Sequence, residues 1–177
     1  GVPWRECDAD TIAYCSAVGY YFAKELSEKL NMTVGIIGCN WGGTSASNWI
    51  DTKNLVRDED TKTYVDEYNK AMEGKTFEQY LKELREYREW EAEWQPKINE
   101  FYEQNPEGSW DDAQKYAGSP SRWPEPLGPK SPFRAGGLYE TMLKRIAPYS
   151  AKGFIYYQGE SDDHKPQMYE KLLKMLI

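Results

Sequence analysis

The sequence has little of the chemistry that most metal and redox sites need. Its 177 residues include one histidine, His164, and three cysteines, none of them in a C-x-x-C pair. An odd number of cysteines without that spacing excludes a disulfide framework and gives no zinc signature. We therefore expect no metal and no cofactor.

Long apolar runs and an excess of positive charge are also missing. No run approaches the ~18 apolar residues of a membrane span, and no n-region with an h-region marks a signal peptide. Lys and Arg number 22 against 29 Asp and Glu, so the net charge of −7 repels phosphate backbones and anionic headgroups. Neither nucleic acid nor a membrane is expected as a partner, and the compartment stays open.

Apolar residues are 40% of the chain and aromatic residues 15%, enough for a core with rings left over for a ligand. The length favours one domain with an insertion. The chain begins in a polar loop and ends inside an amphipathic run, so we expect it to be part of a longer protein.

The order of elements predicts an α/β fold. Apolar residues at helical spacing follow Ser16 as far as Leu30, and residues 33–38 form a short apolar run that leads into a Gly-rich turn. A second apolar run, 153–157, ends in Gln-Gly-Glu. We predict a parallel sheet flanked by helices, a three-layer arrangement in which ligands sit beyond the carboxyl ends of the strands.

Residues 51–131 differ in character and are expected to form a helical and Pro-rich insertion, while residues 1–50 and 132–177 form the α/β domain. Thr76 and Gln79 make a capping box before a long helix that carries an aromatic stripe. Pro96 should perturb the end of this helix. Five prolines in 118–132 predict an extended loop. Helices are expected again over 138–146 and from Met168.

The two predicted strand ends carry polar groups suited to binding an oxyanion. Gly42 and Gly43 offer backbone N–H groups that no Cβ shields, and glycine tolerates the positive φ that aims successive amides at one point. Gln158 adds an amide donor and Glu160 a carboxylate. The alternative is a tight turn without a ligand.

These segments resemble the sialate O-acetylesterase-like branch of the SGNH hydrolases. The similarity lies in Val34-Gly35-Ile36-Ile37 leading into Trp41-Gly42-Gly43-Thr44, and in Tyr156-Tyr157-Gln158-Gly159-Glu160-Ser161. It extends to the helix after Ser16 and to the stretch around Leu138. The resemblance covers residues 14–50 and 132–175 and hardly touches the charged middle.

The resemblance implies an SGNH fold in which a serine esterase removes O-acetyl groups from carbohydrates such as sialate or xylan. Carried over, Gly42 or Gly43 and Gln158 form the oxyanion hole, and Glu160 organises it, paired with Arg134. Trp41, Thr44 and Arg134 are expected to contact the substrate, an acetylated carbohydrate. The family also slightly favours a secreted or periplasmic location.

Two departures from the family pattern are large. Its G-Q-S-N nucleophile motif precedes the first helix, and no such motif occurs in residues 1–177. Its D-x-x-H or D-x-H base motif lies well after the Q-G-E block, at a distance that this sequence does not reach. We therefore expect the chain alone to be inactive.

Other groups are candidates for the missing roles. Ser45 lies in a near match to the nucleophile elbow G-x-S-x-G, although capping a helix is its more common use. His164, beside Asp162 and Asp163, is a candidate base or a surface residue. The two aspartates lack the further oxygens that a calcium site needs.

A second class of function remains open. The chain is either this esterase or a non-catalytic glycan-binding or interaction module, in which the tryptophans supply stacking surface.

Overall fold

A computed structural model describes residues 3–177. Its contacts divide the described chain into two compact units. Unit 1 holds residues 3–42 together with Tyr149–Tyr157, and unit 2 holds Gly43–Pro148 together with Gln158–Ile177. Each unit is described by itself.

Unit 1 contains a short 3-10 helix, Ile12–Tyr14, and one long helix, α1, Ala17–Leu30. The Ser16 hydroxyl accepts a hydrogen bond from the Gly19 N–H at 3.3 Å and caps the start of α1. Asn31 ends it in the left-handed conformation, with φ 49°. The helix predicted after Ser16 is confirmed.

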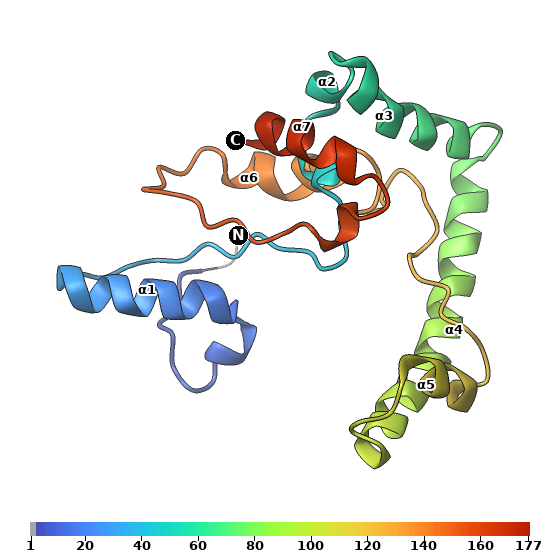
Figure 1. Ribbon diagram of the computed structural model, residues 1–177, viewed down its shortest axis with the longest axis horizontal. Coiled ribbons are helices and arrows are strands. Elements are labelled where there is room, and N and C mark those ends of the chain that lie inside the picture. Colours follow the sequence, from blue (N-terminus) through green and yellow to red (C-terminus); the bar gives the residue numbers. More distant parts are fainter. Residues whose placement is uncertain (1–2) are drawn as a thin grey trace. The chain divides into compact units, whose positions relative to one another are not determined.

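The predicted α/β fold is wrong, because no strand forms among residues 3–177. Both apolar runs, 33–38 and 153–157, are irregular coil (Figure 1). A strand exists only where a second segment completes its ladder of backbone hydrogen bonds, and an apolar run does not supply that partner. The side chains expected inside a sheet are exposed instead: Phe154 by 87% and Ile37 by 40%.

The face of α1 that should cover a sheet is exposed as well. Tyr21 is 69% exposed and Phe22 52%, while the buried residues of the helix are Gly19 and Ala23. The helical period of the sequence predicted the helix correctly, but the described residues form no parallel sheet for this face to cover.

Unit 2 is built from helices around two apolar clusters. The first cluster joins the 3-10 helix Ala46–Trp49 to α2 (Thr52–Leu55), α3 (Glu59–Met72) and α7 (Pro166–Leu176). Its buried members are Ala46, Ile50, Leu55, Tyr64, Ala135, Met168 and Leu172. The helix expected over 138–146 forms as a π turn, Tyr139–Leu143, that continues into α6, Lys144–Ile146.

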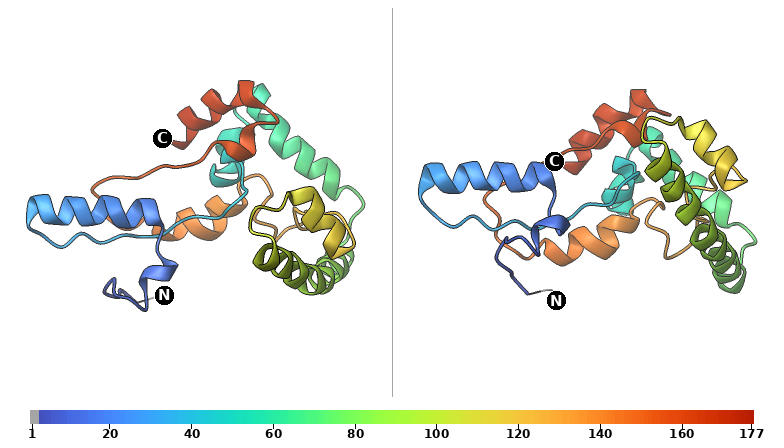
Figure 2. Two further views of the ribbon diagram at one scale, coloured as in Figure 1. Left: turned by 60° about the horizontal axis from the view of Figure 1, so that its bottom comes forward. Right: turned by 90° about the horizontal axis from the view of Figure 1, so that it is seen from below.

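The second cluster joins α4, Phe77–Gln104, to α5, Trp110–Ala117, which lies along it in both views of Figure 2. The capping box of Thr76 and Gln79 forms as predicted. Pro96, expected to perturb the helix end, does not stop α4, which continues to Gln104. A proline removes one helical hydrogen bond. The helix continues beyond it because Ile98 and Phe101 are buried against α5.

The Pro-rich segment 118–132 carries no helix or strand, as predicted, and returns along α4. The Trp94 indole N–H donates to the Ser119 carbonyl at 2.8 Å, and the Lys75 ammonium donates to the Leu127 carbonyl at 3.3 Å. These bonds fix the loop against the helix at both ends.

Gly128 in this loop is a position where a side chain does not fit. A Cβ there would lie 2.1 Å from Cδ2 of Tyr80, whose side chain is fully buried and has no room to turn away. We expect Gly128→Ala to lower the free energy of unfolding by about 3 kcal/mol. Gly153→Ala, where no atom lies within 4 Å of the new Cβ, is the matched control.

Urea denaturation of both variants measures this difference. In a Tyr80→Ala background, Gly128→Ala should cost less free energy of unfolding than it does in the parent protein, because the clashing ring is gone. Equal stability of the Gly128→Ala and Gly153→Ala proteins would contradict the packing described.

Candidate functional site

Two segments that the resemblance singled out meet in unit 2 through a network of hydrogen bonds. The turn that contains Thr44 and Ser45 is joined to the segment from Gln158 to Asp162, more than 110 positions later. Side chains of the second segment hold backbone groups of the first. This contact is the candidate functional site.

Asp162 is the centre of the network and is only 2% exposed. Its Oδ1 accepts from the Ser45 hydroxyl at 2.5 Å, and its Oδ2 accepts from the Ala46 N–H at 2.9 Å and from the Gln158 amide at 2.6 Å. A buried carboxylate is stable only where donors replace its water. Three donors, one of them a backbone N–H, do so here.

The Gln158 amide connects the carboxylate to the turn. Its Nε2 donates to the Thr44 carbonyl at 3.1 Å as well as to Asp162, and the Tyr169 hydroxyl donates to the Gln158 carbonyl at 2.6 Å. The carbonyl and the N–H of one trans peptide point in opposite directions. By holding the Thr44 carbonyl, Gln158 therefore also fixes the direction of the Ser45 N–H, on the other side of that peptide.

Gly43 has the positive φ that its predicted role requires, at 70°. A Cβ at this position would lie 2.5 Å from the ring of Trp123, so this tryptophan covers the glycine closely. Trp41 and Gly42, the other expected site residues of the turn, belong to unit 1.

Ser45 caps the 3-10 helix Ala46–Trp49, which confirms the more common of its two possible uses. Its hydroxyl accepts from the Ser47 N–H at 3.1 Å while donating to Asp162. His164 is exposed, on the turn before α7. The Ser45 hydroxyl donates to a carboxylate and not to an imidazole, so Ser45 and His164 do not form a Ser–His pair among the described residues.

Glu160 and Arg134 do not form the expected ion pair in the described part of the chain. Arg134 donates instead to the carbonyls of Pro129 and Ala135, at 3.1 and 3.3 Å. Glu160 is exposed at the start of the 3-10 helix Glu160–Asp162.

Two site residues do not follow from the sequence. Asn48, 4% exposed, donates from its amide to the carbonyls of Phe133 and Arg134, at 2.9 and 3.0 Å. From the sequence, Asp162 is a candidate only as a metal ligand or as a neighbour of His164. The signal that could have found Asp162 is its place directly after the Q-G-E-S segment, two residues beyond Glu160.

Tyr64 lies against the network from α3, and its hydroxyl is buried without a hydrogen-bond partner. Burial raises the pKa of Tyr64 to about 12, and the negative charges of Asp162 and Glu67 add to the effect. The Lys165 ammonium lies 4.4 Å from the centre of its ring. Tyr64 therefore stays a neutral phenol at physiological pH.

Within residues 3–177 no group of three or more His, Cys, Asp or Glu side chains is arranged to hold a metal ion. None of the described helices is long and apolar enough to cross a membrane.

Comparison of the chain with protein-family models, with curated proteins and with solved structures gives no match. Any functional conclusion therefore rests on the site's own geometry and on the motifs in the sequence.

Proposed function

We propose that this chain contributes the oxyanion-binding part of a serine esterase that removes O-acetyl groups from carbohydrates. The observation that carries the proposal is the pair of hydrogen bonds from the Gln158 amide to the Thr44 carbonyl and to Asp162. These bonds join the two segments whose sequences resemble the esterase blocks. They do so in a helical structure, without the sheet that the family resemblance implied.

Ester hydrolysis needs few groups from residues 1–177 under this proposal. Hydrolysis of an acetyl ester breaks the bond between the acyl carbon and the sugar oxygen and forms one to a water oxygen, which yields acetate and a free hydroxyl. In the tetrahedral intermediate the former carbonyl oxygen carries negative charge, and fixed N–H donors stabilise it. The backbone N–H groups around Gly43 and Ser45 are donors of this type, and the network at Asp162 holds their turn in place.

The test is acetate release from acetylated xylo-oligosaccharides and from p-nitrophenyl acetate by the protein at the full length that its reading frame encodes. We expect turnover that a serine-directed phosphonate abolishes. Residues 1–177 alone should give background rates, since the family's nucleophile motif, G-Q-S-N, does not occur in them.

Two results would contradict the proposal. Glycan binding by the full-length protein without acetate release would favour the non-catalytic module. Turnover by residues 1–177 that Ser45→Ala removes would make Ser45 the nucleophile and overturn the oxyanion role proposed for its turn.

A further inference from the structure

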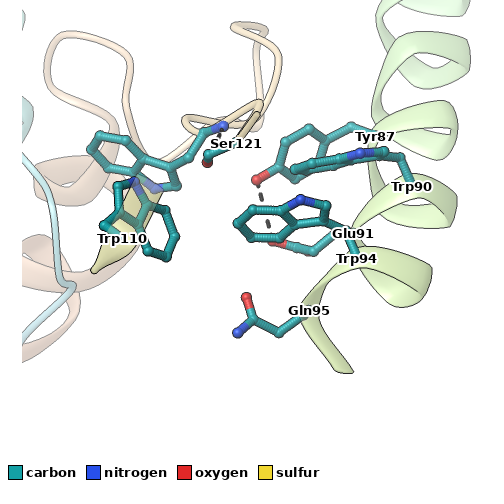
Figure 3. Close-up of a pocket in the computed structure, with 8 residues that line it drawn as sticks. Tyr87, Trp90, Glu91, Trp94, Gln95, Trp110 and Ser121 are labelled. Atoms are coloured by element: carbon teal, nitrogen blue, oxygen red, sulfur yellow. Dashed lines mark hydrogen bonds between the residues drawn. The ribbon is translucent and has the colours of Figure 1, made fainter. Parts of the chain in front are cut away.

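A pocket of about 370 Å³ lies between α4 and the segments that pack on it, apart from the network at Asp162. Figure 3 shows its two sides: Tyr87, Trp90 and Trp94 project from α4, and Trp110 faces them. Glu91, Gln95, Ser121 and Trp123 also line it. A concave site lined by aromatic rings with a few polar groups is the usual form of a small-molecule site.

The rings are fixed before any ligand arrives. Trp90 and Trp94 stack with centroids 5.0 Å apart, and Trp110 meets Trp94 edge-on at 5.8 Å. The indole N–H groups of Trp90 and Trp94 both donate to Ser119, at 3.3 Å to its hydroxyl and 2.8 Å to its carbonyl. A binding surface held in this way costs little entropy when it is used.

Part of this aromatic surface is open to solvent. Trp110 is 48% exposed and Trp123 is 55% exposed, although each ring contacts other residues of the unit. The polar members Glu91 and Gln95, one helical turn apart on α4, are also exposed. Glu91 accepts from the Tyr87 hydroxyl at 3.2 Å, and its carboxylate has further lone pairs to offer.

We propose that this pocket binds the pyranose rings of a neutral glycan. A pyranose has apolar C–H faces that lie flat on indole rings and a rim of hydroxyl groups that donate hydrogen bonds. Trp110 and Trp123, the two exposed tryptophans of the pocket, supply the first surface. Glu91, Gln95 and Ser121 supply acceptors for the second.

The charges of the pocket favour a neutral ligand over a charged one. Among the described residues that line it, Glu91 is the only charged one, so the pocket repels an anionic sugar such as a sialate. A quaternary ammonium is held where several ring faces surround one point, whereas Trp90 and Trp94 are stacked on each other. The Arg122 guanidinium lies 5.1 Å from the centre of the Trp90 ring, so the ring surface open to a ligand is mainly that of Trp110 and Trp123.

Trp123 connects this pocket with the candidate site. It lines the pocket and also covers Gly43, in the turn assigned to oxyanion binding. A glycan on the tryptophans would therefore extend toward that turn. Only this link rests on the proposed function; binding of the glycan does not require hydrolysis.

The experiment is a calorimetric and tryptophan-fluorescence titration of residues 1–177 with xylohexaose and cellohexaose. We expect saturable binding that Trp110→Ala weakens about tenfold and Glu91→Gln weakens less. Trp4→Ala removes a tryptophan that is 65% exposed and lies in unit 1, outside the pocket lining, and should leave the affinity unchanged. Melting temperatures of all variants show whether the fold is retained.

Glu91→Gln keeps every ring in place, so it tests the pocket even where Trp110→Ala fails to fold. No saturable binding of either neutral glycan, or tighter binding of sialic acid or choline, would overturn the inference. Equal loss of affinity in the Trp4→Ala and Trp110→Ala proteins would do the same. Acetate release by the full-length protein without glycan binding in this pocket would refute the binding proposal alone. Glycan binding without acetate release would refute the esterase proposal alone.

Discussion

Replacing Asp162 with alanine is expected to lower the free energy of unfolding by about 3–5 kcal/mol. The side chain is buried and accepts hydrogen bonds from the Ser45 hydroxyl, the Ala46 N–H and the Gln158 amide. Alanine would leave three buried donors without an acceptor, and an unpaired buried polar group costs more than the bond it made. The loss is measured by urea denaturation followed by circular dichroism.

Two further variants make this test specific. Asp162→Asn keeps the shape but turns one acceptor oxygen into an NH₂ group facing other donors, so it should also destabilise the chain, by a smaller amount. Asp163→Ala changes the same residue type one position away, on an exposed side chain, and should stay within about 0.5 kcal/mol of the parent protein. If Asp162→Ala and Asp163→Ala were equally stable, Asp162 would not hold the two segments together.

The helices were predictable because their signals are local. The Ser16 cap, the capping box at Thr76 and the apolar spacing in α1 and α4 each depend on residues within one or two turns. The length of α4 beyond Pro96 does not follow from such local signals. Whether a helix continues past a proline depends on the burial of later residues such as Phe101, and the partner that buries them, α5, comes later in the chain.

The sheet was mispredicted because a strand is not a local property. The run at 33–38 has the composition of a buried strand, and the same composition suits any extended apolar segment. A buried strand differs from an irregular extended segment in having a neighbouring strand that accepts and donates backbone hydrogen bonds. The apolar run itself specifies no register for such a partner. The described residues form no ladder, so these segments stay irregular.

The site was predictable in part. The polar groups after the two apolar runs pointed to the segments that contain Thr44 and Gln158, and these do meet. The motif did not show which side chain joins them. The 3-10 helix Glu160–Asp162 brings the Asp162 carboxylate to the Ala46 N–H. Only the three-dimensional structure shows this turn.

Replacing Gln158 with alanine has the largest effect that we expect on the reaction. Removing one donor at an oxyanion typically lowers kcat by about 10²–10³-fold. Under the proposed function, Gln158 acts either as that donor or by holding the Thr44 carbonyl, which sets the direction of the Ser45 N–H. In both cases the interaction strengthens as charge develops on the reacting oxygen, so kcat of the full-length protein should fall while KM changes little.

Gln167→Ala is the matched control for Gln158→Ala, because Gln167 is an exposed glutamine in the first turn of α7 and should leave both constants unchanged. Gln158→Asn separates the two ways in which Gln158 could act. Its side chain is one methylene shorter and cannot reach both Thr44 and Asp162, so kcat should fall as far as in Gln158→Ala if positioning is the role. A kcat in Gln158→Asn close to that of the parent protein would indicate that the side-chain amide donates directly to the oxyanion. An unchanged kcat with a raised KM in Gln158→Ala would make the amide a substrate-binding group, and the oxyanion role would then be wrong.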